Sequence, residues 1–245
     1  MVNAHLSAKA RAAYEISSTA TLTTLLYQEG LANVFMQGVF PVATGKRKMI
    51  GPAYTLRFVP SREDVDKLFE RDSRTDLQRI TTETVPEGHV LVVDSRGDPS
   101  AASGGALLAL RMETRGVEGI VTDGGFRDSP EIGARSMPAY HQRPAAPPVL
   151  ITHHPEEAQC VIGCGGVCVR PGDLIVGDDE GVVVVPSHLI EVIAERAIKK
   201  TNIECFIEEE IQKGRSIYGL YPPDEDAMRE YETWETQKTT SDREG

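Results

Sequence analysis

The chain has 245 residues, of which 40% are hydrophobic and 26% charged, as in an ordinary globular protein with one substantial core. Its net charge of −11 argues against binding to a nucleic-acid backbone. No run of about 18 apolar residues predicts a membrane span, and the N-terminus lacks the apolar segment of a signal peptide. We therefore expect a cytoplasmic protein with neither a nucleic-acid nor a membrane partner.

The N-terminal part predicts a helix over residues 8–30, because alanines recur at helical spacing and Gly30 suits a helix end; residues 21–26 either continue this helix or begin a second turn. Residues 51–59 alternate between polar and apolar side chains, which is typical of a strand. The charged segment 61–79 predicts a second helix with Ser61 as its N-cap.

The middle of the chain alternates between the two kinds of element. Residues 89–94 form a continuous apolar run, which is typical of a strand buried on both faces. Residues 106–115 predict a helix and 120–122 a short β-branched strand. Ser129-Pro130 predicts the start of another helix, since proline favours the first helical position.

After residue 130 the predicted strands cluster, with strands at 174–176 and 182–185, and residues 186–210 predict a long helix or a pair of helices. Alternation followed by clustering indicates an α/β fold with a mixed sheet. We expect an N-terminal helical extension (1–30), an α/β core (31–190) and C-terminal helices with an acidic tail (191–245). In that tail Asp224 to Trp234 predicts a helix, and we expect its aromatic residues Tyr231 and Trp234 to pack on a neighbouring subunit.

Two glycine pairs surround the most informative stretch of the sequence. Gly104-Gly105 precedes a predicted helix, and Gly124-Gly125 follows a predicted strand and leads into Arg127-Asp128. Turns at the ends of elements leave backbone N–H groups free to bind an anion. Arginine offers a planar fork for a carboxylate, and aspartate a hard oxygen for a divalent cation. An anionic substrate chelated to a metal needs both.

The alternative for the same pair is structural. Asp128 precedes the helix predicted at Ser129, and aspartate is a favoured N-cap, so Asp128 could cap that helix while Arg127 lies on the surface. Cys160, Cys164 and Cys168 recur every four residues, but no second ligand pair completes a zinc site, and we expect them to pack as small apolar residues.

Common catalytic motifs are missing from the chain. The sequence contains no GxSxG, GxxxxGK[ST] or HExxH motif, which excludes the usual serine hydrolase, P-loop and zinc-protease classes. Lysine is not prominent near the glycine pairs, so a Schiff-base aldolase has no obvious nucleophile.

At these residues the chain resembles a known family. The stretch 103–132, SGGALLALRMETRGVEGIVTDGGFRDSPEI, is similar to the signature region of the RraA-like proteins, and the likeness continues through 164–186. This family includes metal-dependent 4-hydroxy-4-methyl-2-oxoglutarate and 4-carboxy-4-hydroxy-2-oxoadipate aldolases, and the regulators of ribonuclease E activity. The resemblance covers about residues 30–215 and belongs to the longer branch of the family.

The resemblance implies an α/β/β/α sandwich related to swivelling domains, with helical N- and C-terminal extensions, assembled as a homotrimer or hexamer with the site between subunits. It implies that Arg127 binds the carboxylate and enolate oxygens of pyruvate and that Asp128 binds the divalent cation, Mg²⁺ or Mn²⁺. It also places the substrate carboxylate against backbone amides of the segment Gly105, Ala106, Leu107 and Leu108.

One position departs from the family pattern. In the aldolases an acidic residue precedes Arg-Asp with twenty residues between them, and here that position is Ala106. The carboxylate that handles protons is therefore missing. Glu204 on the C-terminal helix of a neighbouring subunit is the candidate replacement, because family aldolases bring a glutamate from that helix.

These observations favour a divalent-metal-dependent lyase, a class II pyruvate aldolase or oxaloacetate decarboxylase. Its substrate would be a small 2-oxo acid, either a 4-hydroxy-2-oxo acid or oxaloacetate. The alternative is a non-catalytic ring that binds another protein, as the regulators in the family do. Ala106 favours the alternative, whereas the Arg127-Asp128 pair favours the lyase.

Overall fold

The computed structural model describes residues 6–67, 72 and 74–244. Its α-helices are α1 (Ala8–Ile16), α2 (Thr19–Gln28), α3 (Leu77–Thr84), α4 (Ala106–Thr114), α5 (Ser129–Gly133), α6 (Ile190–Gln212) and α7 (Glu225–Glu244). Its strands are β1 (Phe40–Pro41), β2 (Met49–Pro60), β3 (Val90–Asp94), β4 (Ala102–Gly104), β5 (Gly119–Thr122), β6 (Gly125–Phe126), β7 (Ala139–His141), β8 (Arg143–Pro144), β9 (His153–Ala158), β10 (Ile162–Cys164), β11 (Val167–Val169), β12 (Leu174–Gly177) and β13 (Val182–Val185).

The main sheet is mixed, as the sequence predicts. In the described part of the chain its strands follow the order β1-β7-β5-β3-β2-β12-β13, with β9 also paired to β2. The strands β2, β3, β5 and β7 run parallel, whereas β12 and β13 are antiparallel. The long strand β2 joins the two halves, because residues 49–52 pair with β12 and residues 53–57 pair with β3.

The side chains of β3 alternate between two hydrophobic cores, one on each face of the sheet. Val90 and Val92 contribute to an inner core that includes residues of β12 and β13. Leu91 and Val93 pack instead in a core with α4 and α5. Successive side chains of a strand point to opposite faces, so an all-apolar strand is buried from both sides.

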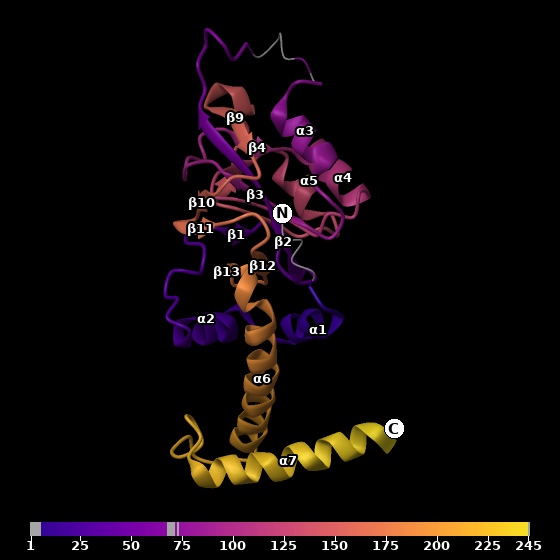
Figure 1. Cartoon of the computed structure of the whole chain (residues 1–245), viewed down its shortest axis with the longest axis vertical. Helices are drawn as coiled ribbons and strands as arrows, with labels where there is room; N and C mark the ends of the chain where they lie inside the picture. Colours follow the sequence, from indigo (N-terminus) through magenta and orange to yellow (C-terminus); the bar gives the residue numbers. More distant parts are fainter. Residues whose placement is uncertain (1–5, 68–71, 73, 245) are drawn as a thin grey trace.

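The strand β13 shows the same alternation in the other half of the sheet. Val182 and Val184 face the inner core, and Val183 and Val185 pack against α1, α2 and α6. The layers are therefore α1, α2 and α6, then β12–β13, then the parallel strands, then α3, α4 and α5 (Figure 1). This confirms the α/β/β/α sandwich with helices at both ends of the chain.

The single helix predicted over 8–30 is wrong, because the structure has two helices, α1 and α2. The chain breaks between them at Ser17 and Ser18, where the Ser17 hydroxyl donates to the Ala13 carbonyl oxygen at 2.8 Å. The Ser18 hydroxyl accepts the N–H of Thr21 and caps α2. Serine competes for backbone hydrogen bonds in this way, and alanine periodicity does not reveal the break.

The helix predicted over 61–79 is also wrong over the described residues 61–67, 72 and 74–76, and of its described residues only the last three, 77–79, are helical. After β2 the chain forms turns, and residues 68–71 and 73 of the predicted helix lie outside the described residues. The helix α3 begins only at Leu77, where the Asp76 carboxylate accepts the N–H of Arg79 at 2.9 Å. The N-cap is thus Asp76 and not Ser61.

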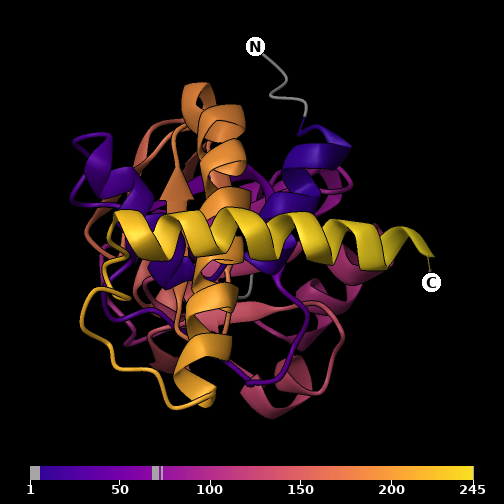
Figure 2. The ribbon, with the colours of Figure 1, turned by 90° about the horizontal axis from the view of Figure 1, so that it is seen from below.

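The C-terminal helix α7 crosses α6 at the end remote from the sheet (Figures 1 and 2). Tyr231 and Trp234 pack with Phe206 of α6, with each pair of ring centroids 6.0 Å apart, and the indole of Trp234 donates to Glu209 at 2.7 Å. The two aromatic residues therefore find a surface within their own chain, although packing of this region on a neighbouring subunit stays a prediction. Over the described ranges, no helix has both the length and the apolar composition needed to cross a membrane.

Candidate active site

The Gly104-Gly105 turn leaves the first turn of α4 open. Gly105 occupies the N-cap and offers no side chain to cap the helix. The N–H of Ala106 points to Oδ2 of Asp128 at 3.3 Å. The N–H groups of Leu107 and Leu108 have no acceptor among the described residues. Two free donors at the positive end of a helix are a ready-made anion site.

The absence of a side chain at position 105 lets Arg127-Asp128 approach α4 closely. A Cβ atom there would lie 2.8 Å from Cγ of Arg127 and 3.0 Å from Oδ2 of Asp128. The first distance is shorter than real Cβ atoms show and the second is very tight, so any larger residue would make Arg127 shift and crowd Asp128. The two predicted glycine turns thus meet in space, because β4 and β6 are neighbours in a small parallel sheet.

The geometry of Asp128 decides between its two interpretations. Asp128 stands at the N-cap position of α5, but its side chain makes no capping hydrogen bond to that helix. Its carboxylate turns instead toward α4, where it accepts the N–H of Ala106. Its backbone is left-handed, with φ 55° and ψ 37°, an uncommon conformation that clusters at functional sites. The structure therefore does not support a capping role.

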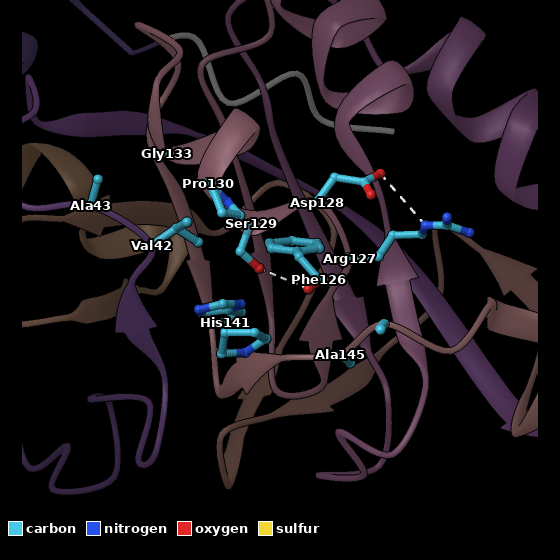
Figure 3. Close-up of a pocket in the computed structure, with 12 residues that line it drawn as sticks. Val42, Ala43, Phe126, Arg127, Asp128, Ser129, Pro130, Gly133, His141 and Ala145 are labelled. Atoms are coloured by element: carbon cyan, nitrogen blue, oxygen red, sulfur yellow. Dashed lines mark hydrogen bonds and ion pairs between the residues drawn. The ribbon is translucent and has the colours of Figure 1, made fainter.

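Arg127 lies beside this carboxylate with most of its hydrogen-bonding capacity unused. Its Nε is 3.5 Å from Oδ2 of Asp128, and its backbone N–H donates to the carbonyl oxygen of Gly104 at 3.1 Å. The terminal nitrogens of the guanidinium have no partner in the described part of the chain, and the side chain is 48% exposed. Figure 3 shows the two charged groups pointing toward each other.

A cavity of about 480 Å³ brings the predicted residues together. Its wall includes Gly105, Leu107 and Leu108 of α4 together with Arg127 and Asp128. Ala106 takes part only through its backbone N–H.

The same cavity is bordered by two residues of α3 that the sequence analysis missed, Gln78 and Arg79. Aspartate three residues before Arg79 is an N-cap signal that could have placed the helix correctly. No local signal shows that the first turn of α3 faces the first turn of α4.

A second cavity, of about 540 Å³, lies on the other side of Arg127 and Asp128 and is lined by Phe126, Ser129 and His141 among others (Figure 3). The His141 ring stacks on Phe126 with centroids 5.8 Å apart. Burial lowers the pKa of His141 to about 4, so its imidazole is neutral near pH 7. This second cavity therefore gains no charge from His141.

Asp123 at the end of β5 has a structural task. Its buried carboxylate accepts the N–H groups of Ser95 at 2.7 Å, Gly97 at 3.0 Å and Gly165 at 3.4 Å. Burial is the main cause that raises its pKa. The carboxylate thereby fixes the loop after β3 and the β10–β11 hairpin to the strand that leads into the Arg127-Asp128 turn.

With Asp128 as its carboxylate ligand, the site suits a Mg²⁺ or Mn²⁺ ion that keeps most of its water better than a metal whose ligands all come from the protein. Asp128 is the one carboxylate that lines either cavity in the described ranges, and its side chain is 40% exposed. Nowhere in the described ranges do three His, Cys, Asp or Glu side chains gather as a metal site, the cysteines included. Mg²⁺ is commonly held by one or two carboxylates and keeps several waters, so a single open aspartate suits it.

Glu204 does not lie at this site within its own chain. It belongs to α6, in the helical layer on the opposite side of the sheet from α4 and α5. Its carboxylate accepts the hydroxyl of Thr21 at 3.0 Å and pairs with Lys200 at 2.9 Å. A role in the site of a neighbouring subunit stays a prediction, and it would require Glu204 to leave these partners.

Comparison with known proteins identifies the family. The family described as RraA-like, Aldolase/RraA, matches residues 19–184, well over half of the chain. The chain belongs to the RraA-like family. The match contains the glycine pairs, Arg127-Asp128 and the strands of the sandwich, while α1 and α7 lie outside it.

Relatives of this RraA-like chain carry different names. An uncharacterized protein of Methanocaldococcus jannaschii is 30% identical over 74% of this chain and 82% of its own length. A Cupriavidus taiwanensis protein, provisionally named a 4-hydroxy-4-methyl-2-oxoglutarate aldolase, is 33% identical over 66% of this chain and 92% of its own. The crystal structure of Streptomyces coelicolor RraAS2, described as an unusual member of the RNase ES inhibitor RraA family, matches with a TM-score of 0.75 and 30% identity, covering 83% of this chain and 98% of its own.

Proposed function

We propose that this RraA-like protein is a divalent-metal-dependent lyase that releases pyruvate from a 2-oxo acid, as a class II pyruvate aldolase or oxaloacetate decarboxylase. One observation carries the proposal. The free N–H groups of Leu107 and Leu108, the guanidinium of Arg127 and the carboxylate of Asp128 border a single cavity. These are the groups that a chelating 2-oxo acid requires.

The substrate binds with its C1 carboxylate at the N-terminus of α4, where the two N–H groups and the helix dipole stabilise its charge. Arg127 donates to the C2 oxygen, on which negative charge develops as the C3–C4 bond breaks. Asp128 would hold the divalent cation, which when bound supplies a Lewis acid for the 2-oxo group. The bonding electrons move into the enolate, and C3 then takes a proton to give pyruvate.

The two reactions differ in what happens at C4. Oxaloacetate loses CO₂ from C4, and no base is needed. A 4-hydroxy-2-oxo acid must give up its C4 hydroxyl proton before a carbonyl product can leave. With Ala106 in the acidic position, no carboxylate other than Asp128 borders the cavity in the described residues. Losing a general base typically costs about 10²–10⁴-fold in rate, so decarboxylation is the favoured activity.

The proposed working form is a homotrimer or hexamer. Leu107 is 80% exposed and Leu110 42% exposed on α4 beside the cavity, so one chain alone leaves apolar surface open at its site. A neighbouring copy that covered this surface would also exclude water from the cavity. We expect light scattering of the full chain to give three or six times the chain mass, and a monomer would contradict this expectation.

The second candidate is a non-catalytic ring that binds a protein partner. Ala106 favours it, because the missing carboxylate removes part of the proton machinery of an aldolase. The name of the Streptomyces coelicolor relative, an RNase ES inhibitor RraA family member, points the same way. The arrangement of Arg127 and Asp128 around the open N-terminus of α4 speaks against it, since protein binding does not require a glycine at position 105 to admit the pair.

The deciding experiment measures pyruvate released from oxaloacetate with Mg²⁺ or Mn²⁺, and metal binding by calorimetry. The wild-type protein should exceed the metal-only rate. Asp128→Ala should weaken metal binding at least about tenfold and abolish the excess rate, because it removes the one carboxylate that the described residues place at the cavity. The exposed neighbour Glu131 provides the matched control, and Glu131→Ala should change neither quantity. Wild-type rates equal to the metal-only rate would refute the lyase and leave the protein-binding ring.

A further inference from the structure

Arg79 places a positively charged guanidinium in the wall of the candidate active site, and the proposed function gives this group no role. Arg79 is the third residue of α3, is exposed, and lines the same cavity as Arg127. No ion pair of its side chain is present among the described residues. Glu83, one helical turn further along α3, is already held by Arg111 at 2.8 Å. A guanidinium without a carboxylate partner is available to an anion from outside the chain.

The position of Arg79 is electrostatically unfavourable without such an anion. The first turn of a helix carries a partial positive charge, which disfavours a cation there. The first turns of α3 and α4 both border this cavity, and the described side chains that line it supply two guanidinium groups against the single carboxylate of Asp128. This local excess of positive charge occurs in a chain whose net charge is −11.

Gln78 fixes α3 relative to the Gly104-Gly105 turn. Its side chain is buried, and its Nε2 donates to the carbonyl oxygen of Ser103 at 2.7 Å. Ser103 is the residue directly before the glycine pair that opens α4. The contact therefore ties the first turn of α3 to the turn at which the substrate carboxylate is proposed to bind, and Arg79 is the next residue in the chain.

We propose that Arg79 is a specificity-determining residue that binds the second carboxylate of a dicarboxylic 2-oxo acid. The inference rests on the proposed function, which places the first carboxylate at α4 and the 2-oxo oxygen at Arg127. Arg79 borders the same cavity from the first turn of α3, where its guanidinium would form a charge-assisted pair with the second carboxylate of the substrate. A monocarboxylic 2-oxo acid leaves Arg79 unpaired and gains nothing from it.

The test uses two unreactive 2-oxo acids of equal chain length, 2-oxoglutarate and 2-oxopentanoate, which differ only in the second carboxylate. Calorimetry with Mg²⁺ present should show that the full-length protein binds 2-oxoglutarate about 10- to 100-fold more tightly. Arg79→Met should abolish that preference by weakening 2-oxoglutarate alone, and Arg79→Lys should retain part of it. Arg74→Met is the matched control, since Arg74 lines a neighbouring cavity and not this one, and the preference should persist.

The inference is overturned if the wild-type protein shows no preference, or if Arg79→Met weakens both acids equally or neither. Its failure is distinguishable from failure of the lyase proposal, because binding and pyruvate release are measured separately. A preference that depends on Arg79 in a protein that releases no pyruvate would support the inference and refute the lyase. If the protein releases pyruvate and Arg79→Met leaves the preference for 2-oxoglutarate unchanged, the lyase proposal is supported and the role of Arg79 is refuted.

Discussion

Arg127→Ala is expected to lower the rate constant for oxaloacetate decarboxylation by about 10²–10³-fold, the usual cost of removing one donor from a developing oxyanion. The guanidinium has two terminal nitrogens without partners in the described chain, and it borders the cavity beside the free N–H groups of α4. The effect should fall mainly on kcat, because the charge at the C2 oxygen develops in the transition state. Steady-state kinetics of pyruvate formation give the measurement.

Arg143→Ala is the matched control, because Arg143 is an exposed arginine on β8 that neither contributes to this cavity nor changes its charge. The Arg143→Ala protein should decarboxylate oxaloacetate at the wild-type rate. Arg127→Lys should recover little activity, since an ammonium cannot present the two parallel donors of the guanidinium plane. An Arg127→Ala protein with an unchanged rate would show that the arginine takes no part in the reaction.

Ala106→Asp is expected to raise the retro-aldol rate on a 4-hydroxy-2-oxo acid by about 10²–10⁴-fold, which is the usual contribution of a general base. Ala106 is the first residue of α4 and lies between Gly105 and Leu107, which both border the cavity, so we expect a carboxylate at this position to come close to it. Decarboxylation of oxaloacetate should change little, because that reaction needs no base at C4. The ratio of the two rates, measured on one protein preparation, tests the prediction.

Ala106→Asn separates charge from size, since the amide has the shape of the carboxylate but cannot accept the proton. We expect it to leave the retro-aldol rate at the low wild-type level. If Ala106→Asp gives no gain while its fold is intact, the missing carboxylate is not what limits aldol cleavage in this protein. Glu204 of a neighbouring subunit would then become the stronger candidate for the base.

Local pattern in the sequence predicted an α/β fold with a mixed sheet, and the resemblance to the RraA-like proteins implied the α/β/β/α layers that the structure confirms. The run of valines in β13 must be buried on both faces, and so must the apolar run of β3, which requires a sheet covered on each side. The same local reasoning failed at Ser17-Ser18 and at residues 61–79. There a serine or aspartate side chain, and not the hydrophobic period, decides where a helix begins.

The residue types in the sequence indicated the candidate site, but they did not predict how its side chains are arranged in space. Glycine pairs at the ends of elements and an adjacent Arg-Asp pair indicate an anion and a metal from chemistry alone. Whether Asp128 caps its own helix or turns to α4 depends on a contact between residues 22 positions apart in the chain. Only the pairing of β4 with β6 brings those two turns together.

Arg79 and Glu204 both show that the sequence alone does not say which residues share a cavity. Arg79 lines the cavity but was not predicted, whereas Glu204 was predicted and lies elsewhere in its own chain. Arg79 stood in a segment whose helix was misplaced, and it joins the site because α3 packs beside α4. Glu204 was assigned by family resemblance, and the structure pairs it with Thr21 and Lys200 in the other helical layer. The sequence by itself determined the α/β class, buried strands such as β3 and β5, and the choice of Arg127-Asp128 as the candidate site, since these follow from side chains near one another in the chain. The tertiary structure decided which charges share the cavity, because that depends on contacts between distant segments, which no local pattern encodes.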